Sequence, residues 1–160
     1  MNDLSIRQAT LSDLLLIQNF NRELCAKENR EYDATINPEY PFTKEGEEYF
    51  KSRIESEDAL VIIAELEGKA VGYLVGSIVP SEDYRNISQM AEAENMFVDE
   101  AFRGKKIGGT LIENFEDWCQ KKGVQKIRYV VSAENNKALA FYKAHGCKEI
   151  NITLEKNLNE

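Results

Sequence analysis

A stretch of positive charge and glycine interrupts a strongly acidic chain, which has 160 residues and a formal net charge of -8. Its members are Arg103, Gly104, Lys105, Lys106, Gly108 and Gly109. They follow an apolar run and precede helical spacing, so they lie where a helix begins. The first amides of a helix have no partner within it and favour phosphate, and glycine lets them approach a ligand closely. The stretch therefore predicts a phosphate-binding loop; a surface loop with a helix cap is the alternative.

The spacing excludes two common phosphate-binding loops. A Walker loop needs a lysine between its last glycine and the Ser/Thr, whereas Gly109 is followed directly by Thr110. A dinucleotide fingerprint needs G-x-G-x-x-G, which the glycines at 104, 108 and 109 do not supply.

The stretch resembles the signature of the GNAT N-acetyltransferase superfamily, Arg/Gln-x-x-Gly-x-Gly/Ala after a strand. In that family the loop holds the pyrophosphate of acetyl-CoA. Arg103 and Gly108 match the signature, whereas Lys106 stands where the first glycine is usual. A side chain must therefore be accommodated at this point of the loop.

A second block, residues 135–147, resembles the later GNAT pattern Asn-x-x-Ala-x-x-Phe/Leu-Tyr followed by Gly-Phe. The matching residues are Asn135, Ala138, Phe141, Tyr142 and Gly146. Cys147 replaces the usual phenylalanine, a change that affects packing more than chemistry. One helix, a glycine stop and one strand separate the two blocks, as in the family. The N-terminal order of elements and the V-G-Y-L-V-G hairpin at 71–76 agree too, so the resemblance covers nearly the whole chain.

Acetyl transfer to an amine requires that the amine lose a proton, because an alkyl ammonium has a pKa of about 10. Glu92, Glu94, Met96 and Val98 alternate along an expected strand and should point to one face. The resemblance implies that an acidic residue of this strand accepts the amine proton. We favour Glu94, with Glu92 second; an exposed strand carboxylate is the alternative for each.

The resemblance also implies roles around the cofactor. Backbone groups near Phe97 and Val98 would pair with the pantetheine arm, and Tyr142 would protonate the departing thiolate; a core tyrosine is the alternative for Tyr142. Asn135 would bond the cofactor or fix the loop before its helix. The expected cofactor-binding residues are Phe97, Val98, Arg103, Gly104, Lys105, Lys106, Gly108, Gly109 and Asn135.

The elements that must position these residues follow from apolar periodicity and turn signals. The expected strands are 5–9, 60–66, 71–79, about 90–98, 126–132 and 147–154. Two helices are expected in the first part of the chain, one from a cap at Thr10 or Ser12 to about Lys27 and one from Thr43 to about Ile54, with a loop at 28–42 between them. Two more are expected later, one from about Ile107 to a stop at Gly123 and one over 136–144. The order β-α-α-β-β-β-α-β-α-β indicates an α/β class, and the resemblance implies a GNAT-like mixed, mostly antiparallel twisted sheet flanked by helices.

Composition and charge limit the domain organisation and the kinds of partner that fit this chain. A hydrophobic content of 42% and a charged content of 30% favour one globular domain over 1–160. Three cysteines without a C-x-x-C pair indicate free thiols in a reducing cytoplasm, and a single histidine excludes a multi-His metal site. For the latter reason we expect no metal. We expect no spanning helix, because no run of 18 apolar residues occurs, and no signal peptide, because residues 1–4 lead straight into folded-looking sequence. The acidic balance disfavours nucleic acid and anionic membranes as partners.

The sequence therefore predicts an enzyme that moves an acetyl group directly from acetyl-CoA to a primary amine. Net acidity and the two strand carboxylates suit a cationic small molecule of polyamine- or aminoglycoside-like type. Transfer to a peptide or protein amine is an alternative, and so is a non-enzymatic acyl-CoA-binding module. A homodimer is possible, although no residue specifies an interface.

Overall fold

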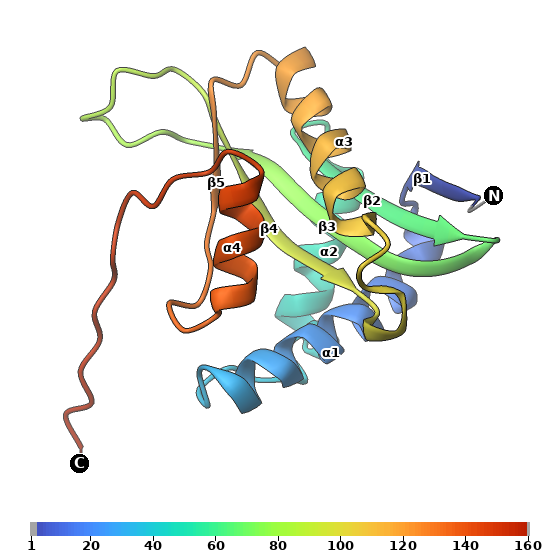
Figure 1. Cartoon of the computed structure of the whole chain (residues 1–160), viewed down its shortest axis with the longest axis horizontal. Coiled ribbons are helices and arrows are strands. Elements are labelled where there is room, and N and C mark those ends of the chain that lie inside the picture. The colour runs from blue at the N-terminus through green and yellow to red at the C-terminus, as the bar shows by residue number, and fades with distance from the viewer. Residues whose placement is uncertain (1–2, 160) are drawn as a thin grey trace. The chain divides into compact units, whose positions relative to one another are not determined.

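The computed structural model describes residues 3–159, and its contacts divide the chain into one compact unit ending at Val130 and another beginning at Val131. The first unit contains a five-stranded sheet in sequential order (Figure 1). Its strands are β1 (Leu4–Gln8), β2 (Ala59–Leu66), β3 (Lys69–Val79), β4 (Met90–Val98) and β5 (Lys126–Tyr129). All neighbours pair antiparallel except β4 and β5, which are parallel. The predicted mixed, mostly antiparallel sheet is confirmed; a single domain over 1–160 stays a prediction.

Helices cover both faces of this sheet. On one face lie α1 (Leu14–Glu31) and α2 (Lys44–Glu55), and on the other lies α3 (Ile107–Lys121) (Figure 1). Phe20 of α1 stacks on Tyr73 of β3 with ring centroids 6.0 Å apart, and fully buried Phe50 of α2 belongs to the same core. Burial of such large apolar side chains is the main force that holds helices on a sheet.

Local signals set several helix ends as expected. The Thr43 side chain accepts a hydrogen bond from the Gly46 amide at 3.1 Å, which caps α2. Gly123 ends α3 with φ 77, a left-handed conformation that glycine adopts without strain. α1 continues to Glu31, however, so the predicted loop at 28–42 is wrong over its first turn. The added residues, Glu28–Glu31, are mostly good helix formers.

A β-bulge in β4 changes which side chains of this strand lie on the same face of the sheet. Val75 of β3 lies opposite Asn95, and the next residue, Gly76, lies opposite Ala93, so Glu94 is the extra residue. Asn95 therefore shares a face with Val75, and Glu94 turns to the same side because its carboxylate meets Ser77. The prediction that Glu94 points with Met96 and Val98 is wrong, since an inserted residue breaks the two-residue alternation.

The second unit contains α4 (Asn136–Ala144), capped by the Asn135 side chain, which accepts from the Ala138 amide at 3.1 Å. The predicted strand at 147–154 is wrong, because this segment has no regular secondary structure. Ile150, Ile152 and Leu154 are 63%, 83% and 89% exposed. Alternating apolar residues stabilise a strand only when they pack on neighbours, and these three side chains are mostly in solvent. The predicted strand at 126–132 likewise ends earlier, at Tyr129.

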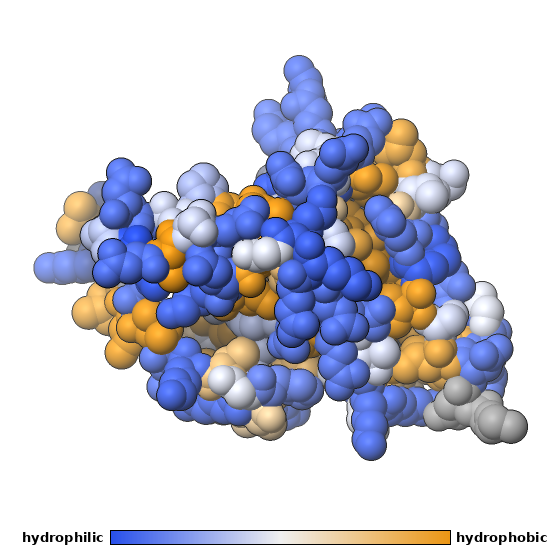
Figure 2. All heavy atoms as spheres, turned by 90° about the horizontal axis from the view of Figure 1, so that it is seen from above, coloured by the Kyte–Doolittle hydropathy of each residue, from blue (hydrophilic) through white to orange (hydrophobic). Residues whose placement is uncertain are grey.

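The face in Figure 2 is mostly hydrophilic, with hydrophobic side chains in small separate areas. Over residues 3–159, no helix is long and apolar enough to cross a membrane. The same residues contain no group of three or more His, Cys, Asp or Glu side chains placed to hold a metal ion. All three cysteines are free thiols, as expected.

The contact between α3 and β3 can be tested at Gly76. A Cβ at Gly76 would lie 2.3 Å from two ring atoms of Phe115, which is fully buried in α3. We expect Gly76→Ala to lower the free energy of unfolding by about 1–3 kcal/mol, because the buried ring has nowhere to move. Denaturant unfolding measures the loss. Adding Phe115→Leu should recover part of it, so the double variant should be more stable than the sum of the single changes. Simple additivity would contradict the described packing.

Candidate functional site

The loop before α3 leads into the amino end of a long helix, where backbone amides point outward. The first backbone hydrogen bond of the helix runs from the Thr110 amide to the Lys106 carbonyl at 3.0 Å. The amides of residues 107–109 precede it, so they have no carbonyl partner within the helix and lie at its positive end. α3 is 15 residues long, so its aligned peptide dipoles give a partial positive charge at its amino end. The amides at this end therefore favour a phosphate group.

Lys106, which stands where the family signature has glycine, adopts φ 64 and ψ 9. This left-handed conformation costs a non-glycine residue about 1–2 kcal/mol, which explains why glycine is usual there. Gly104 also has a positive φ, 78. The side chain at 106 is accommodated because it is exposed to solvent.

The three loop cations gather where β4 ends. The Arg103 Nε donates to the carbonyl oxygen of Val98 at 3.0 Å, and its guanidinium lies 5.9 Å from the Phe97 ring centroid. The Lys105 ammonium lies 5.3 Å from the ring of Phe102. Because these contacts leave most of each cationic head in solvent, the loop can offer charge and amides to one anion.

The free edge of β4 begins in the middle of the strand. β5 pairs with β4 only from Met90 to Ala93, so over the described residues the stretch from Glu94 to Val98 has no partner on that side. Its backbone groups can take an extended ligand in place of a strand, as an exposed sheet edge commonly does. Phe97 and Val98, predicted to bind the pantetheine arm, lie in this stretch.

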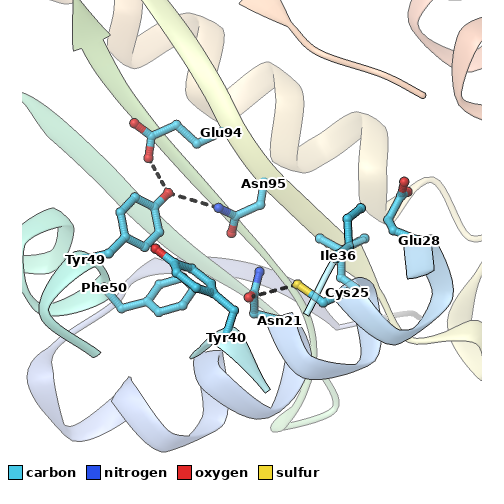
Figure 3. A pocket seen from close by; sticks show the side chains of 10 residues that line it. Asn21, Cys25, Glu28, Ile36, Tyr40, Tyr49, Phe50, Glu94 and Asn95 are labelled. Carbon is cyan, nitrogen blue, oxygen red and sulfur yellow. Dashed lines mark hydrogen bonds between the residues drawn. The ribbon is translucent and has the colours of Figure 1, made fainter. Parts of the chain in front are cut away.

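A cavity of about 260 Å³ lies beside this edge, between α1, α2 and β4 (Figure 3). Two carboxylates and several aromatic and amide side chains line it. These lining residues include Asn21, Cys25, Glu28, Ile36, Tyr40, Tyr49, Glu94 and Asn95. A small cavity with apolar walls and a few convergent polar groups is the usual form of a small-molecule site.

Glu94 lies in a dense hydrogen-bond network. Arg53 Nε lies 3.0 Å and 2.9 Å from its two oxygens, and Ser77 Oγ donates to Oε1 at 2.5 Å. The Tyr49 hydroxyl donates to Oε2 and accepts from Asn95 Nδ2 at 3.0 Å (Figure 3). The Glu94 side chain is only 12% exposed. A carboxylate so placed stays bound to its donors unless a stronger partner displaces one.

The hydrogen-bond network and its burial shift the pKa values of Glu94 and Tyr49. Burial alone would raise the pKa of Glu94, but hydrogen bonds from Arg53, Ser77 and Tyr49 and the charge of Arg53 hold it below its ordinary value. Burial and the nearby Glu94 charge raise the pKa of Tyr49 well above its ordinary value. At neutral pH the pair is therefore an ionised carboxylate and a neutral phenol.

Glu92 has a different environment. Arg128 Nε donates to its Oε2 at 2.8 Å, while Nη1 of the same arginine contacts Glu82 at 2.9 Å. Glu92 is not among the residues that line the described cavity. Of the two carboxylates considered for proton transfer, the structure thus brings only Glu94 to the cavity.

Asn135 and Tyr142 belong to the second unit, at the cap and within α4. Burial, with a smaller contribution from Cys147, raises the pKa of Tyr142 to about 12. A phenol with this pKa keeps its proton throughout the neutral range.

Sequence analysis missed Tyr49, Arg53, Ser77 and Asn95. Tyr49 and Arg53 are four residues apart on α2, so they share a face of that helix, and this spacing was the available signal. Asn95 was expected to point away from Glu94 and shares its side only because of the bulge.

Comparison with known proteins assigns the chain to a family. The sequence model of the acetyltransferase (GNAT) family matches residues 23–147. The chain is 31% identical over 103 residues to the uncharacterized N-acetyltransferase MJ1207 of Methanocaldococcus jannaschii, across 63% of this chain and 44% of that protein. It is 28% identical over 101 residues to the glucosamine 6-phosphate N-acetyltransferase of Arabidopsis thaliana, across 62% of this chain and 66% of that protein. The chain thus spans less than half the length of the M. jannaschii relative.

Solved structures with the same fold extend over nearly the whole chain. A mutant BH1408 protein from Bacillus halodurans has a TM-score of 0.82 at 22% identity, covering 96% of this chain and 99% of that one. The enzyme AAC(6')-Iy, solved with a bisubstrate analog, has a TM-score of 0.77 at 18% identity, covering 96% and 97%. At these identities the likeness establishes the fold. Because the family match covers most of the sequence and this fold agrees with it, the chain belongs to the acetyltransferase (GNAT) family.

Proposed function

We propose that the chain transfers an acetyl group directly from acetyl-CoA to the primary amine of a small cationic molecule, without an acyl-enzyme. The observation that supports the proposal most is that β4 connects the cavity to the cationic loop. Glu94 lines the cavity in the bulge, and the same strand ends at Val98 beside the cationic loop. At about 3.3 Å per residue, the four steps between them span about 13 Å of open strand edge.

The cofactor side is supported by the loop and the edge together. The amides of residues 107–109 and the three cations would hold the pyrophosphate. The edge at Phe97 and Val98 would pair with the amide groups of the pantetheine arm and lead the thioester toward Glu94. One of these backbone amides could serve as the oxyanion donor. The contribution of Asn135 to cofactor binding is proposed from the family pattern, beside its observed role as a cap.

The acceptor side is supported by the chemistry of the cavity. Glu28 and Glu94 line it, and the whole chain has a net charge of -8, so a cationic amine is favoured over an anionic one. Ile36 and Tyr40 supply apolar wall, which suits the carbon skeleton of such an amine. The fold likeness to AAC(6')-Iy, an aminoglycoside N-acetyltransferase, supports the same class.

Two groups would manage the protons. Glu94 stays ionised at neutral pH, so it can accept a proton as the amine attacks the thioester. Tyr142 has a pKa of about 12, so it holds its proton at neutral pH and would supply it to the departing thiolate. An alkaline decline of turnover below pH 10 would therefore not report Tyr142.

A panel of acceptors tests the proposal. Release of free CoA thiol is measured with polyamines, aminoglycosides, a lysine peptide and peptide N-termini. We expect turnover with one or more small cationic amines, because the cavity is small and acidic. Turnover with peptides alone would favour the peptide alternative. CoA binding without turnover on any amine would indicate a non-enzymatic acyl-CoA-binding module.

The loop assignment predicts the effect of a side chain at Gly108. Gly108→Val should lower CoA affinity at least tenfold, because the new side chain occupies the space where a phosphate approaches the helix amides. Calorimetric titration with CoA measures this effect. Asn114→Val, on an exposed position of the same helix, controls for the cost of a β-branched residue. Wild-type affinity in Gly108→Val would move the phosphate site elsewhere.

The choice between the two carboxylates predicts a pH effect. Glu94→Gln should lower turnover about 10²–10⁴-fold at neutral pH, because the attacking amine loses its proton acceptor. Part of the loss should return as pH rises and more amine becomes neutral. Glu92→Gln should stay within a few-fold of wild type, since its carboxylate lies outside the cavity. Steady-state kinetics from pH 6 to pH 10 measure both; the opposite ranking would reverse the assignment.

A further inference from the structure

The Tyr49 hydroxyl is a polar group of the cavity that retains capacity for one more hydrogen bond, beside the Asn95 Oδ1 atom, which has no hydrogen-bond partner among the described residues. It donates its proton to Glu94 and accepts a hydrogen bond from Asn95 Nδ2 at 3.0 Å. A phenolic oxygen has one proton and two acceptor sites, so one acceptor site remains. Tyr49 lines the cavity together with Glu94 and Asn95 (Figure 3).

Glu94, by contrast, is held by three donors, and one of them bridges both of its oxygens. Its Oε1 faces Arg53 Nε at 3.0 Å and Ser77 Oγ at 2.5 Å, and its Oε2 faces Arg53 Nε at 2.9 Å and the Tyr49 hydroxyl. The single Nε hydrogen of Arg53 is shared between the two oxygens, so three hydrogens occupy a carboxylate that offers about four acceptor sites. An amine in the cavity would have to compete with these three donors to reach Glu94 directly, whereas the Tyr49 oxygen still has an acceptor site for it.

We infer that Tyr49 is a catalytic residue that passes the proton of the attacking amine to Glu94, an assignment that rests on the proposed acetyl transfer. The amine donates to the remaining acceptor site of the Tyr49 oxygen while the Tyr49 proton lies on the side of Glu94. One proton enters the hydroxyl as the other leaves it. Tyr49 is therefore a neutral phenol before and after the step.

The atoms and electrons balance in the following way. The nitrogen lone pair of the neutral amine forms a bond to the thioester carbon, and the carbonyl π electrons move to oxygen. The nitrogen becomes cationic and acidic, its proton passes to Tyr49 Oη, and the Tyr49 proton passes to Glu94 Oε2. The carbonyl then re-forms as the C–S bond breaks, and the sulfur takes a proton from its acid. The products are an amide and the CoA thiol, and the Glu94 proton returns to solvent, to which the side chain is 12% exposed.

The surroundings of the hydroxyl fit a relay rather than a phenolate base. Burial and the Glu94 charge keep the pKa of Tyr49 well above its ordinary value, so it does not lose its proton unless another arrives. Asn95 fixes the direction of the hydroxyl, and Arg53, whose guanidinium lies 4.9 Å from the Tyr49 ring centroid, keeps Glu94 ionised. The β4 bulge is what brings Asn95 and Glu94 to this side together.

Kinetics of single and double variants test the relay. With an amine that the wild type acetylates, Tyr49→Phe should lower kcat about 10²-fold or more with little change in KM, because the ring still packs while the relay is lost. Glu94→Gln should cause a loss of similar size, and the double variant should lose no more than either alone within about threefold. Tyr84→Phe, at an 81% exposed tyrosine, is the matched control and should match wild type.

A proton inventory on the wild type gives a second test that does not depend on any variant folding. With chemistry rate-limiting, kcat plotted against the deuterium fraction of the solvent should curve downward, as two protons moving together require. A linear plot would overturn the relay.

The variant outcomes also separate the two proposals. Wild-type kcat in Tyr49→Phe, a rise in KM alone, or losses that multiply in the double variant would each overturn the relay and leave acetyl transfer standing. A wild type that binds CoA yet acetylates no amine would overturn the proposed function, and the relay with it.

Discussion

The ion pair between Arg53 and Glu94 is the interaction on which the acceptor side of the structure depends. It joins α2 to β4, and its carboxylate is also bound by Ser77 of β3 and Tyr49 of α2. Removing either partner would leave a largely buried charge without compensation, which is strongly destabilising. The pair therefore holds the cavity wall in place and, by the same contacts, fixes the protonation state of its carboxylate. The contacts of Glu94 that stabilise this part of the fold are therefore the same ones that keep its carboxylate ionised.

Much of the fold follows from local signals that a single sequence carries. The β2–β3 hairpin, the cap at Thr43, the stop at Gly123 and the loop before α3 all depend on residues within a few positions of one another. The order of strands in the sheet agrees with the order in the chain. The cationic loop before α3 was therefore predictable, because its glycines, its charges and the start of the helix are contiguous in sequence.

The rest depends on pairings that lie far apart in sequence. The bulge at Glu94 appears only when β4 is aligned with β3, so alternation alone assigned Glu94 to the wrong face. Tyr49 is 45 residues from Glu94, and its contact with the carboxylate has no local signature. The segment at 147–154 shows the opposite failure: it alternates like a strand, yet it has no regular secondary structure, and Ile150, Ile152 and Leu154 are exposed.

Lys106 has a consequence for the flexibility of the unfolded chain. Glycine at this position would remove the cost of a left-handed conformation, about 1–2 kcal/mol, but it would also give the unfolded chain more conformations to lose, about 0.5–1 kcal/mol. The first effect is about twice the second, so the two only partly cancel. The usual glycine of the family signature is thus explained partly by stability and partly by the room it leaves for a ligand. In this chain the same position instead carries an exposed cation directly before the first amides of α3, and its charge adds to the positive potential there.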